Sequence, residues 1–331
     1  MGRINASKVA ELAGVSRTAV SRSFSGKGRV SPKTRKKVME AVAQLGYRPN
    51  GLASSLARKS SDIVALINGN DYDLREAFFI QSLSKSLFER GLTPLMLSVH
   101  NDDTGEDSLD QFLRFPLLTA IVSADSVEAR FVIPHCEFFP PIMLNENFRV
   151  TDNVDIVHVD EAKGIAELIA FLKGCDARTL WFISGRRTTS AHSSRRMAVL
   201  EAVAESDLRI ADSENGDFSY ESGAAATRAL AARGAIPDAV FAANDLMAMG
   251  AMDVLRYQLG VKVPEQTFVA GFDDIPQAAW PTYCLPSVRQ SDDAIIEAIQ
   301  QIINERTNDT MPQTRLRKDV PTRFVLRGIL Q

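Results

Sequence analysis

The sequence predicts a small all-α domain followed by a larger α/β body that contains two parallel sheets. Three observations lead to this prediction. The length of 331 residues is sufficient for more than one domain. The first 46 residues contain three short helical patterns with start and stop signals. From Asp62 onward, short apolar runs alternate with amphipathic helical stretches, which is typical of parallel strands covered by helices on both faces.

Electrical charge divides the chain at the same place. The whole sequence has a formal net charge of −3, from 38 Lys and Arg against 41 Asp and Glu. Residues 1–60 contain 13 basic and two acidic side chains, a net charge of +11, whereas the remainder contains 25 basic and 39 acidic side chains, a net charge of −14. This asymmetry indicates a basic module that binds a polyanion, joined to an acidic body.

Composition excludes several classes of protein. The apolar fraction of 45% and the charged fraction of 24% are ordinary for folded soluble domains. No apolar run reaches the roughly 18 residues that span a bilayer, and the first residues lack the apolar stretch of a signal peptide. The three cysteines form no CxxC pair, and the four histidines show no metal-binding spacing. We therefore expect a cytoplasmic protein with no membrane association, no metal and no cofactor.

The first two helices are predicted from their end signals. Asn5 or Ser7 can act as N-cap of a first helix. This helix ends at Gly14, because glycine adopts a left-handed backbone conformation at little energetic cost. After a tight turn, Ser16 caps a second helix over residues 17–24. The inward positions of this second helix hold small or β-branched residues, which allow two helices to cross closely. Its other face is polar and basic.

The third helix begins with Ser31 as N-cap and Pro32 at its first position, and it ends at Gly46. A helix, a glycine turn and a second helix with a polar face are typical of a helix-turn-helix, which places its second helix in the major groove of DNA. A small helical bundle with a solvated charged face is the alternative interpretation.

The amino-acid sequence of this region is more specific than its pattern of helices. The string AELAGVSRTAVSRSFSGKGRVSPKTRKKVMEAVAQLGYRPN resembles the DNA-binding headpiece of the LacI/GalR family of transcription regulators, almost without gaps over residues 9–57. The resemblance implies a headpiece over residues 1–46. It implies base-reading contacts by Arg17, Thr18 and Arg22, and phosphate contacts by Ser16, Ser21, Ser31, Thr34 and Tyr47. Arginine can bind guanine O6 and N7 with two hydrogen bonds, so the two arginines are the expected guanine contacts.

Residues 47–61, YRPNGLASSLARKSS, are too few and too polar to fold alone. The resemblance implies that this segment is a hinge helix whose minor-groove contacts are made by Asn50, Ala53 and Leu56. Leu56 matches a leucine that wedges between base pairs and kinks the DNA. Gly51 opposes helix formation by about 1 kcal/mol relative to alanine, and a plain linker is the alternative.

The acidic body is predicted to contain two Rossmann-like lobes with a cleft between them. Eight apolar runs are expected to be buried strands, namely residues 63–67, 93–99, 117–124, 140–145, 155–160, 179–184, 239–244 and 268–274. In open α/β sheets, ligands bind at the carboxyl ends of the strands. The polar residues that follow these runs are therefore the candidate ligand-binding residues.

The body, residues 62–331, resembles the ligand-binding core of the same family, which is related to periplasmic sugar-binding proteins. The matching sequence segments are VDEAKG, VFAANDLMAMGAM, VAGFDD, LPSVRQ and RFVLRG. The resemblance implies an amino-terminal lobe of about 62–159 plus 291–320 and a carboxy-terminal lobe of about 160–290 plus 321–331. It implies an effector site formed by Phe78, Phe79, Asp160, Arg195, Asn244 and Asp273.

Five of these six residues also have a purely structural alternative. Arg195 could lie at the solvated start of a helix, Asn244 and Asp273 could be helix N-caps, and the two phenylalanines could belong to the core. The stretch INGNDYDLREAFF differs from the family pattern after the first strand, so the identity of the effector is open.

The functional prediction is a homodimeric transcription regulator, a repressor of a metabolic operon. It would bind a palindromic operator in double-stranded DNA and respond to a sugar, a sugar acid or a phosphorylated metabolite. The alternative is a cytosolic small-molecule-binding protein or an enzyme of sugar metabolism that uses the same cleft. An enzyme is disfavoured because the adjacent Asp273 and Asp274 should point to opposite sides of a strand, and GRRTTS lacks the pattern of a phosphate-binding loop.

Overall fold

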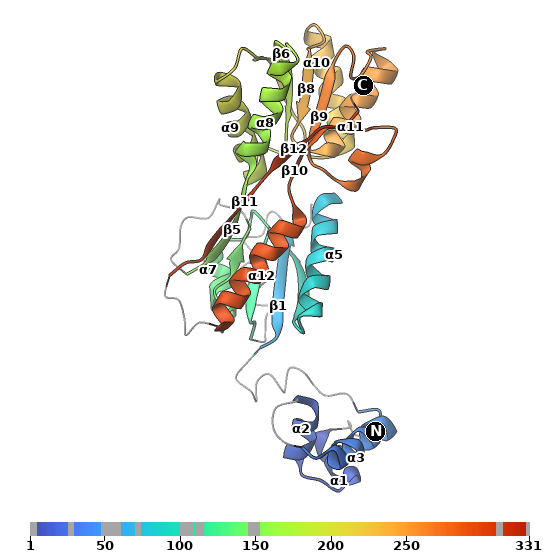
Figure 1. Ribbon diagram of the computed structural model, residues 1–331, viewed down its shortest axis with the longest axis vertical. Helices are drawn as coiled ribbons and strands as arrows, with labels where there is room; N and C mark the ends of the chain where they lie inside the picture. Colours follow the sequence, from blue (N-terminus) through green and yellow to red (C-terminus); the bar gives the residue numbers. More distant parts are fainter. Residues whose placement is uncertain are drawn as a thin grey trace. The chain divides into compact units, whose positions relative to one another are not determined.

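The structure is a computed structural model that describes residues 5–25, 30–47, 61–69, 74–99, 109, 116–144, 153–308 and 314–328. The chain forms two compact units, Met1–Ser61 and Asp62–Gln331. Figure 1 shows the helical first unit and the layered α/β second unit. The hinge residues Asn50, Ala53 and Leu56, together with Gly51, lie outside the described residues.

The first unit contains the three predicted helices, α1 (Ala6–Ala13), α2 (Arg17–Ser25) and α3 (Pro32–Leu45). Asn5, rather than Ser7, is the N-cap of α1, because its side chain accepts hydrogen bonds from the backbone N–H of residues 7 and 8. Gly14 and Gly46 end α1 and α3 in the left-handed conformation, with φ of 64° and 60°. Buried Val9, Val20 and Val38 from the three helices form the centre of this small core.

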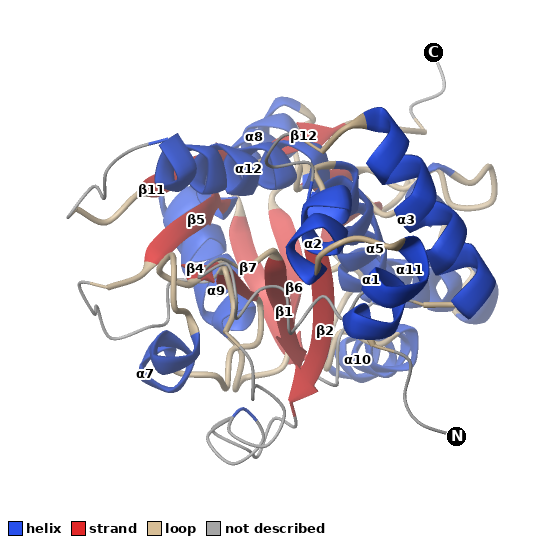
Figure 2. Ribbon diagram, turned by 90° about the horizontal axis from the view of Figure 1, so that it is seen from below, coloured by secondary structure: helices blue, strands red, loops and turns tan. Residues whose placement is uncertain are grey.

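The first lobe of the second unit is built on a six-stranded, fully parallel sheet in the order β11-β5-β4-β3-β1-β2. Its strands are β1 (Ile63–Gly69), β2 (Thr93–Val99), β3 (Thr119–Val122), β4 (Ile142–Met143), β5 (Asp155–Asp160) and β11 (Arg317–Pro321). Its helical segments are α5 (Leu74–Glu89), α7 (Ala129–Val132), η1 (Ile133–His135) and α12 (Asp292–Asn308). Figure 2 shows β1 and β2 side by side, as their parallel pairing requires.

The second lobe has a six-stranded sheet in the order β12-β10-β9-β8-β6-β7, in which only the β10–β12 pair is antiparallel. Its strands are β6 (Thr179–Ser184), β7 (Arg209–Asn215), β8 (Ala239–Ala242), β9 (Phe268–Asp273), β10 (Ser287–Arg289) and β12 (Arg323–Val325). Its helical segments are α8 (Glu161–Gly174), α9 (Ser190–Ala204), α10 (Tyr220–Arg233), α11 (Asp245–Asp253), η2 (Val254–Gln258) and η3 (Pro276–Ala279). Continuous burial of β6, β8 and β9 follows from their apolar sequences.

Within the described residues, the chain passes between the two lobes three times: from β5 to α8, from β10 to α12, and from β11 to β12. Buried Thr322 joins two of these passages. Its hydroxyl donates a 2.7 Å hydrogen bond to the carbonyl of Asp160 and accepts a 3.0 Å bond from the N–H of Gly164. The two passages are thus tied together at one point, next to the first turn of α8.

This close approach predicts the effect of adding one methyl group. A Cβ on Gly164 would lie 2.5 Å from Val288 Cγ1 and 2.7 Å from Thr322 Oγ1, so Gly164→Ala is expected to destabilise the protein by about 1–3 kcal/mol. Gly174, in the same helix, has no atom within 4 Å of such a Cβ, so Gly174→Ala is expected to stabilise by up to about 1 kcal/mol. Urea unfolding of both variants measures the difference. Equal stabilities would contradict this account of the crossing.

Two further findings concern the sequence predictions. The strand β7 was not predicted, because its sequence RIADSEN is polar and its side chains alternate between exposed and half-buried at the edge of the sheet. None of the helices in the described ranges combines the length and the apolar character that crossing a bilayer requires.

Candidate functional site

The helix α2 presents a polar face. Arg17, Thr18, Ser21 and Arg22 are exposed on it, whereas Val20 on the opposite side is buried in the core of the first unit. Ser16 caps the helix, because its Oγ accepts a 3.2 Å hydrogen bond from the N–H of residue 19. The two exposed arginines, Arg17 and Arg22, provide ten N–H donors in fixed forks, which suits the acceptor-rich edge of guanine.

The helix α3 adds a basic surface. Ser31 caps it, accepting a 3.1 Å hydrogen bond from the N–H of Thr34, and the two hydroxyl oxygens are 2.8 Å apart. Tyr47 is half-buried and its ring packs 6.3 Å from that of Phe24. The exposed basic side chains on α3 are Lys33, Arg35, Lys36 and Lys37. Hydroxyls at helix starts together with basic side chains are suited to phosphate oxygens.

A cavity of about 760 Å³ lies between the two lobes of the second unit. The first lobe lines it with residues at the ends of β1, β3 and β5, including Gly69, residues 123–126 and His158. The second lobe contributes residues that follow β6 and β7, including Arg186 and Phe218, and the last residue of β9. The cavity therefore lies at the carboxyl ends of both parallel sheets, where ligands bind in open α/β folds.

Arg195 is the central cation of this cavity and is only 6% exposed. Its Nε donates a 2.9 Å hydrogen bond to Glu161, Nη1 donates to the carbonyl of Ala243, and Nη2 lies 3.5 Å from Asp273 Oδ1. Its guanidinium also lies over the ring of Phe272, 3.9 Å from the ring centre. These contacts fix the planar guanidinium group at the edge of the cavity that it lines.

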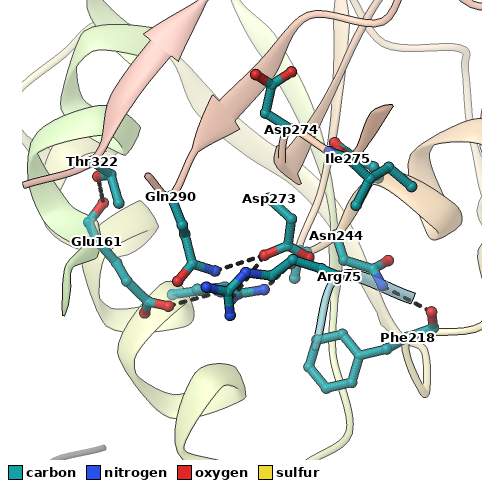
Figure 3. Close-up of polar contacts among 12 residues, drawn as sticks. Arg75, Glu161, Phe218, Asn244, Asp273, Asp274, Ile275, Gln290 and Thr322 are labelled. Atoms are coloured by element: carbon teal, nitrogen blue, oxygen red, sulfur yellow. Dashed lines mark hydrogen bonds and ion pairs between the residues drawn. The ribbon is translucent and has the colours of Figure 1, made fainter. Parts of the chain in front are cut away.

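Asp273 faces the same cavity from the end of β9. Its Oδ1 accepts a 2.6 Å hydrogen bond from Gln290 Nε2, and it is 5% exposed. The next carboxylate points away from it (Figure 3): Asp274 forms ion pairs with Arg289 and Arg327. The prediction that the two adjacent carboxylates diverge is confirmed.

The start of α9 forms the hydroxyl-rich side of the cavity. Residues that line it include Thr188, Thr189, Ser190, Ser193 and Ser194. Asp125 of the first lobe accepts hydrogen bonds from the N–H of Ser190 at 3.0 Å and from its hydroxyl at 2.5 Å. A carboxylate is favourable at a helix N-terminus, so this contact joins the two lobes across the cavity. The nearby carboxylate of Asp217 has its pKa lowered, chiefly by hydrogen bonds from Ser219.

The structure brings together some of the predicted effector residues. Phe79, Arg195 and Asp273 line the cavity. Phe78 is half-buried and is not among the residues that line it. Asp160 is the N-cap of α8, accepting from the N–H of Ala162 at 3.2 Å. Asp160 is thus a helix cap and does not line the cavity either.

Asn244 is a helix cap as well. Its Oδ1 accepts a 2.9 Å hydrogen bond from the N–H of Met247, and its Nδ2 donates to the carbonyl of Phe218 at 2.8 Å (Figure 3). It does not line the main cavity but holds the backbone of Phe218, which does. Gly185 makes room for that ring, because a Cβ there would lie 1.9 Å from Phe218 Cζ.

Several cavity residues were missed by the sequence analysis. They are Arg75, Glu76, Asp125, Glu161, Phe218 and Gln290, with the hydroxyl-bearing residues at the start of α9. Arg186, which follows the predicted strand 179–184, was among the expected cleft residues and does line the cavity. The run TTSAHSS, ahead of an apolar helix pattern, was a usable signal for a polar helix start.

Comparisons with known proteins agree with this organisation. The family model described as "Bacterial regulatory proteins, lacI family" matches residues 7–50, and the model "Periplasmic binding protein-like domain" matches residues 169–328. The chain is 30% identical over 323 residues to the HTH-type transcriptional regulator CelR of Thermobifida fusca, with 93% of each chain covered. It is 31% identical over 308 residues to the HTH-type transcriptional regulator AscG of Escherichia coli (strain K12), with 89% of each covered. The chain belongs to the LacI family.

Solved structures of LacI-family proteins have the same fold. The Lac repressor dimer bound to operator and the anti-inducer ONPF has a TM-score of 0.86 at 21% identity, covering 98% of each chain. The CelR–cellobiose complex has a TM-score of 0.69 at 27% identity, covering 98% of this chain and 99% of the other. The predicted fold class is confirmed, and as a LacI-family member the protein is a DNA-binding transcription regulator.

Proposed function

We propose that this LacI-family protein is a cytoplasmic, homodimeric repressor of a metabolic operon, controlled by an uncharged sugar bound between its two lobes. The observation that carries the effector part is the cluster of Arg195, Asp273 and Gln290 on one wall of the cavity. A guanidinium, a carboxylate and an amide offer paired donors and acceptors, which match the paired oxygens of a polyol.

The charge of the cavity favours an uncharged effector. Among the described residues, its lining includes three arginines and five carboxylates: Arg75, Arg186, Arg195, Glu76, Asp125, Glu161, Asp217 and Asp273. Arg75 is already ion-paired with Asp292 at 2.8 Å, and Arg195 contacts two of the carboxylates. A phosphate or a carboxylate on the effector would therefore meet an excess of like charge. Phe79 and Phe218 add apolar ring surface against which a sugar face can pack.

Operator binding is proposed for two copies acting together. One headpiece offers one exposed α2 face, and two headpieces related by a two-fold axis would read the halves of a palindrome. Phe88 on α5 and Met96 on the edge strand β2 are 74% and 58% exposed, which supports a contact of the first lobe with a second copy. Relatives include the Lac repressor, whose dimer has been solved on its operator.

Binding rather than catalysis is proposed for the cavity. Glu161 and Asp273 both contact Arg195, so they do not form a free acid and base on opposite sides of a bond. The relatives named above are transcription regulators.

A thermal-shift panel tests the effector proposal. Cellobiose, glucose, galactose and ribose would be compared with glucose 6-phosphate, glucuronate and gluconate on the full chain. We expect at least one neutral sugar to stabilise the protein by about 2.7 kcal/mol at 100 times its Kd, which corresponds to a rise in Tm on the order of 5–10 °C. Shifts produced only by the phosphorylated or acidic compounds would contradict an uncharged effector.

A further inference from the structure

The turn that carries Asp273 has an unusual backbone. Asp273 and Asp274 have φ of 104° and 60°, in the left-handed half of conformational space that non-glycine residues rarely adopt. Such a backbone persists only where surrounding contacts determine it, and it concentrates at binding sites. Asp273 is the last residue of β9 and lines the cavity, and Asp274 is the first residue of the turn that follows.

A buried carboxylate behind the cavity holds this turn. Asp245, the first residue of α11, is 1% exposed and its side chain contacts the turn. Its Oδ2 accepts a 2.8 Å hydrogen bond from the N–H of Ile275, and its Oδ1 accepts a 2.6 Å bond from the hydroxyl of Ser287. Burial and the charge of Asp273 raise the pKa of Asp245. Burying a carboxylic acid costs free energy unless it is hydrogen-bonded, so the contacts of Asp245 with the turn indicate a specific role for this residue.

Ser287 completes the support. Its Oγ accepts a 3.0 Å hydrogen bond from the N–H of Asp274 while it donates to Asp245. The backbone N–H groups of two successive turn residues are therefore fixed through one carboxylate and one hydroxyl. Gly271 belongs to the same arrangement, because a Cβ there would lie 2.2 Å from Asp245 Oδ1 and would push the carboxylate away.

The other side of the turn is held by charge. The Asp274 carboxylate, with a side chain only 2% exposed, forms ion pairs with Arg289 on β10 and Arg327 beyond β12. Neither Asp245 nor Ser287 lines the main cavity. Their contacts converge on the backbone of residues 273–275. That backbone determines the direction of the Asp273 carboxylate, which contacts Arg195 and Gln290.

We propose that Asp245 and Ser287 are positioning residues for effector binding: they hold the turn at the end of β9 in its left-handed conformation, so that Asp273 faces the cavity. The functional half of this inference rests on the proposed sugar-binding role of the cavity, whereas the structural half concerns the turn alone.

The test compares two substitutions that each remove one buried hydroxyl. Ser287→Ala removes the support, whereas Thr267→Val removes a hydroxyl that donates to the carbonyl of Pro237 at the opposite end of β9. Full-length wild type and both variants would be titrated separately with cellobiose, glucose, galactose and ribose by calorimetry. We expect Ser287→Ala to bind each sugar that wild type binds at least 10-fold more weakly, and Thr267→Val to stay within about twofold. Affinities of Ser287→Ala that match those of Thr267→Val would overturn the proposal.

Crystal structures of the same three proteins, with Asp245→Asn as a fourth, provide a readout that needs no ligand. In Ser287→Ala or Asp245→Asn we expect Asp273 to leave its left-handed φ and its hydrogen bond with Gln290 to lengthen or break. An unchanged turn in both variants would overturn the inference. If wild type binds none of the four sugars, the proposed effector fails, and the crystal structures alone decide whether these residues hold the turn.

Discussion

Replacing Arg195 by alanine is expected to lower the free energy of unfolding by about 3–5 kcal/mol and to weaken sugar binding more than 100-fold. Arg195 is buried between Glu161 and Asp273, so its removal leaves two carboxylates in a poorly solvated wall without their cation. Breaking a buried pair by removing one partner costs this much because the remaining charge is uncompensated. Urea unfolding and calorimetric titration with the neutral sugar that gives the largest thermal shift measure the two effects.

Arg196 provides a matched control on the same helix. It is exposed, so Arg196→Ala should change the free energy of unfolding by no more than about 0.5 kcal/mol and leave sugar affinity intact. Arg195→Lys separates charge from shape. It keeps a cation but cannot reproduce the planar fork, so we expect most of the affinity to be lost with a smaller loss of stability. If Arg195→Ala bound sugar as wild type does, the site would lie elsewhere.

Replacing Arg17 by alanine should reduce operator affinity strongly while leaving binding to random DNA almost unchanged. A bidentate arginine–guanine contact contributes about 1–3 kcal/mol of discrimination, and a dimer that reads two half-sites loses it twice, roughly 2–6 kcal/mol. Arg17 is exposed on α2 and its removal disturbs no core contact, so the folded headpiece should persist. The operator would be obtained by selection from random DNA with the wild-type protein, and affinities measured by fluorescence anisotropy at one fixed salt concentration.

Thr34→Ala is the control for contacts that carry no sequence information. Thr34 lies at the start of α3, where its hydroxyl and the helix N-terminus suit a phosphate. Its removal should weaken binding to operator and to random DNA by the same factor. If Arg17→Ala behaved in this way too, its assignment as a base-reading residue would be wrong, and a phosphate contact would replace it.

Much of the fold could be predicted from the sequence because its signals are local. Ser31 and Gly46 bound α3 through contacts within one helical turn, and the apolar runs of β1 and β6 need only burial on both faces. The strands β7, β11 and β12 were missed for the opposite reason. All three lie at sheet edges, and β11 and β12 also pair with strands that are not their neighbours in the chain.

The residues of the site also divide into those with a local sequence signal and those without one. Arg195 and Asp273 were predicted from the resemblance to the family, and their side chains contact each other. Glu161 was not predicted, although it directly follows Asp160. Asp160 caps the helix, and Glu161 lines the cavity. Gln290 follows a three-residue strand that no periodicity could reveal, and Asp125 acquires its role only when the second lobe brings Ser190 to it. Contacts across two lobes depend on the tertiary fold and have no signature in either segment alone.

The late position of β11 and β12 has a consequence for how the second unit is made. These strands, separated by Thr322, supply an edge to each of the two sheets. During synthesis, the first sheet stays incomplete until β11 has emerged from the ribosome and the second until β12 follows, so a nascent chain would expose the unpaired edges of β5 and β10 almost to the end. The two lobes should therefore gain their final protection against hydrogen exchange together, as one cooperative unit.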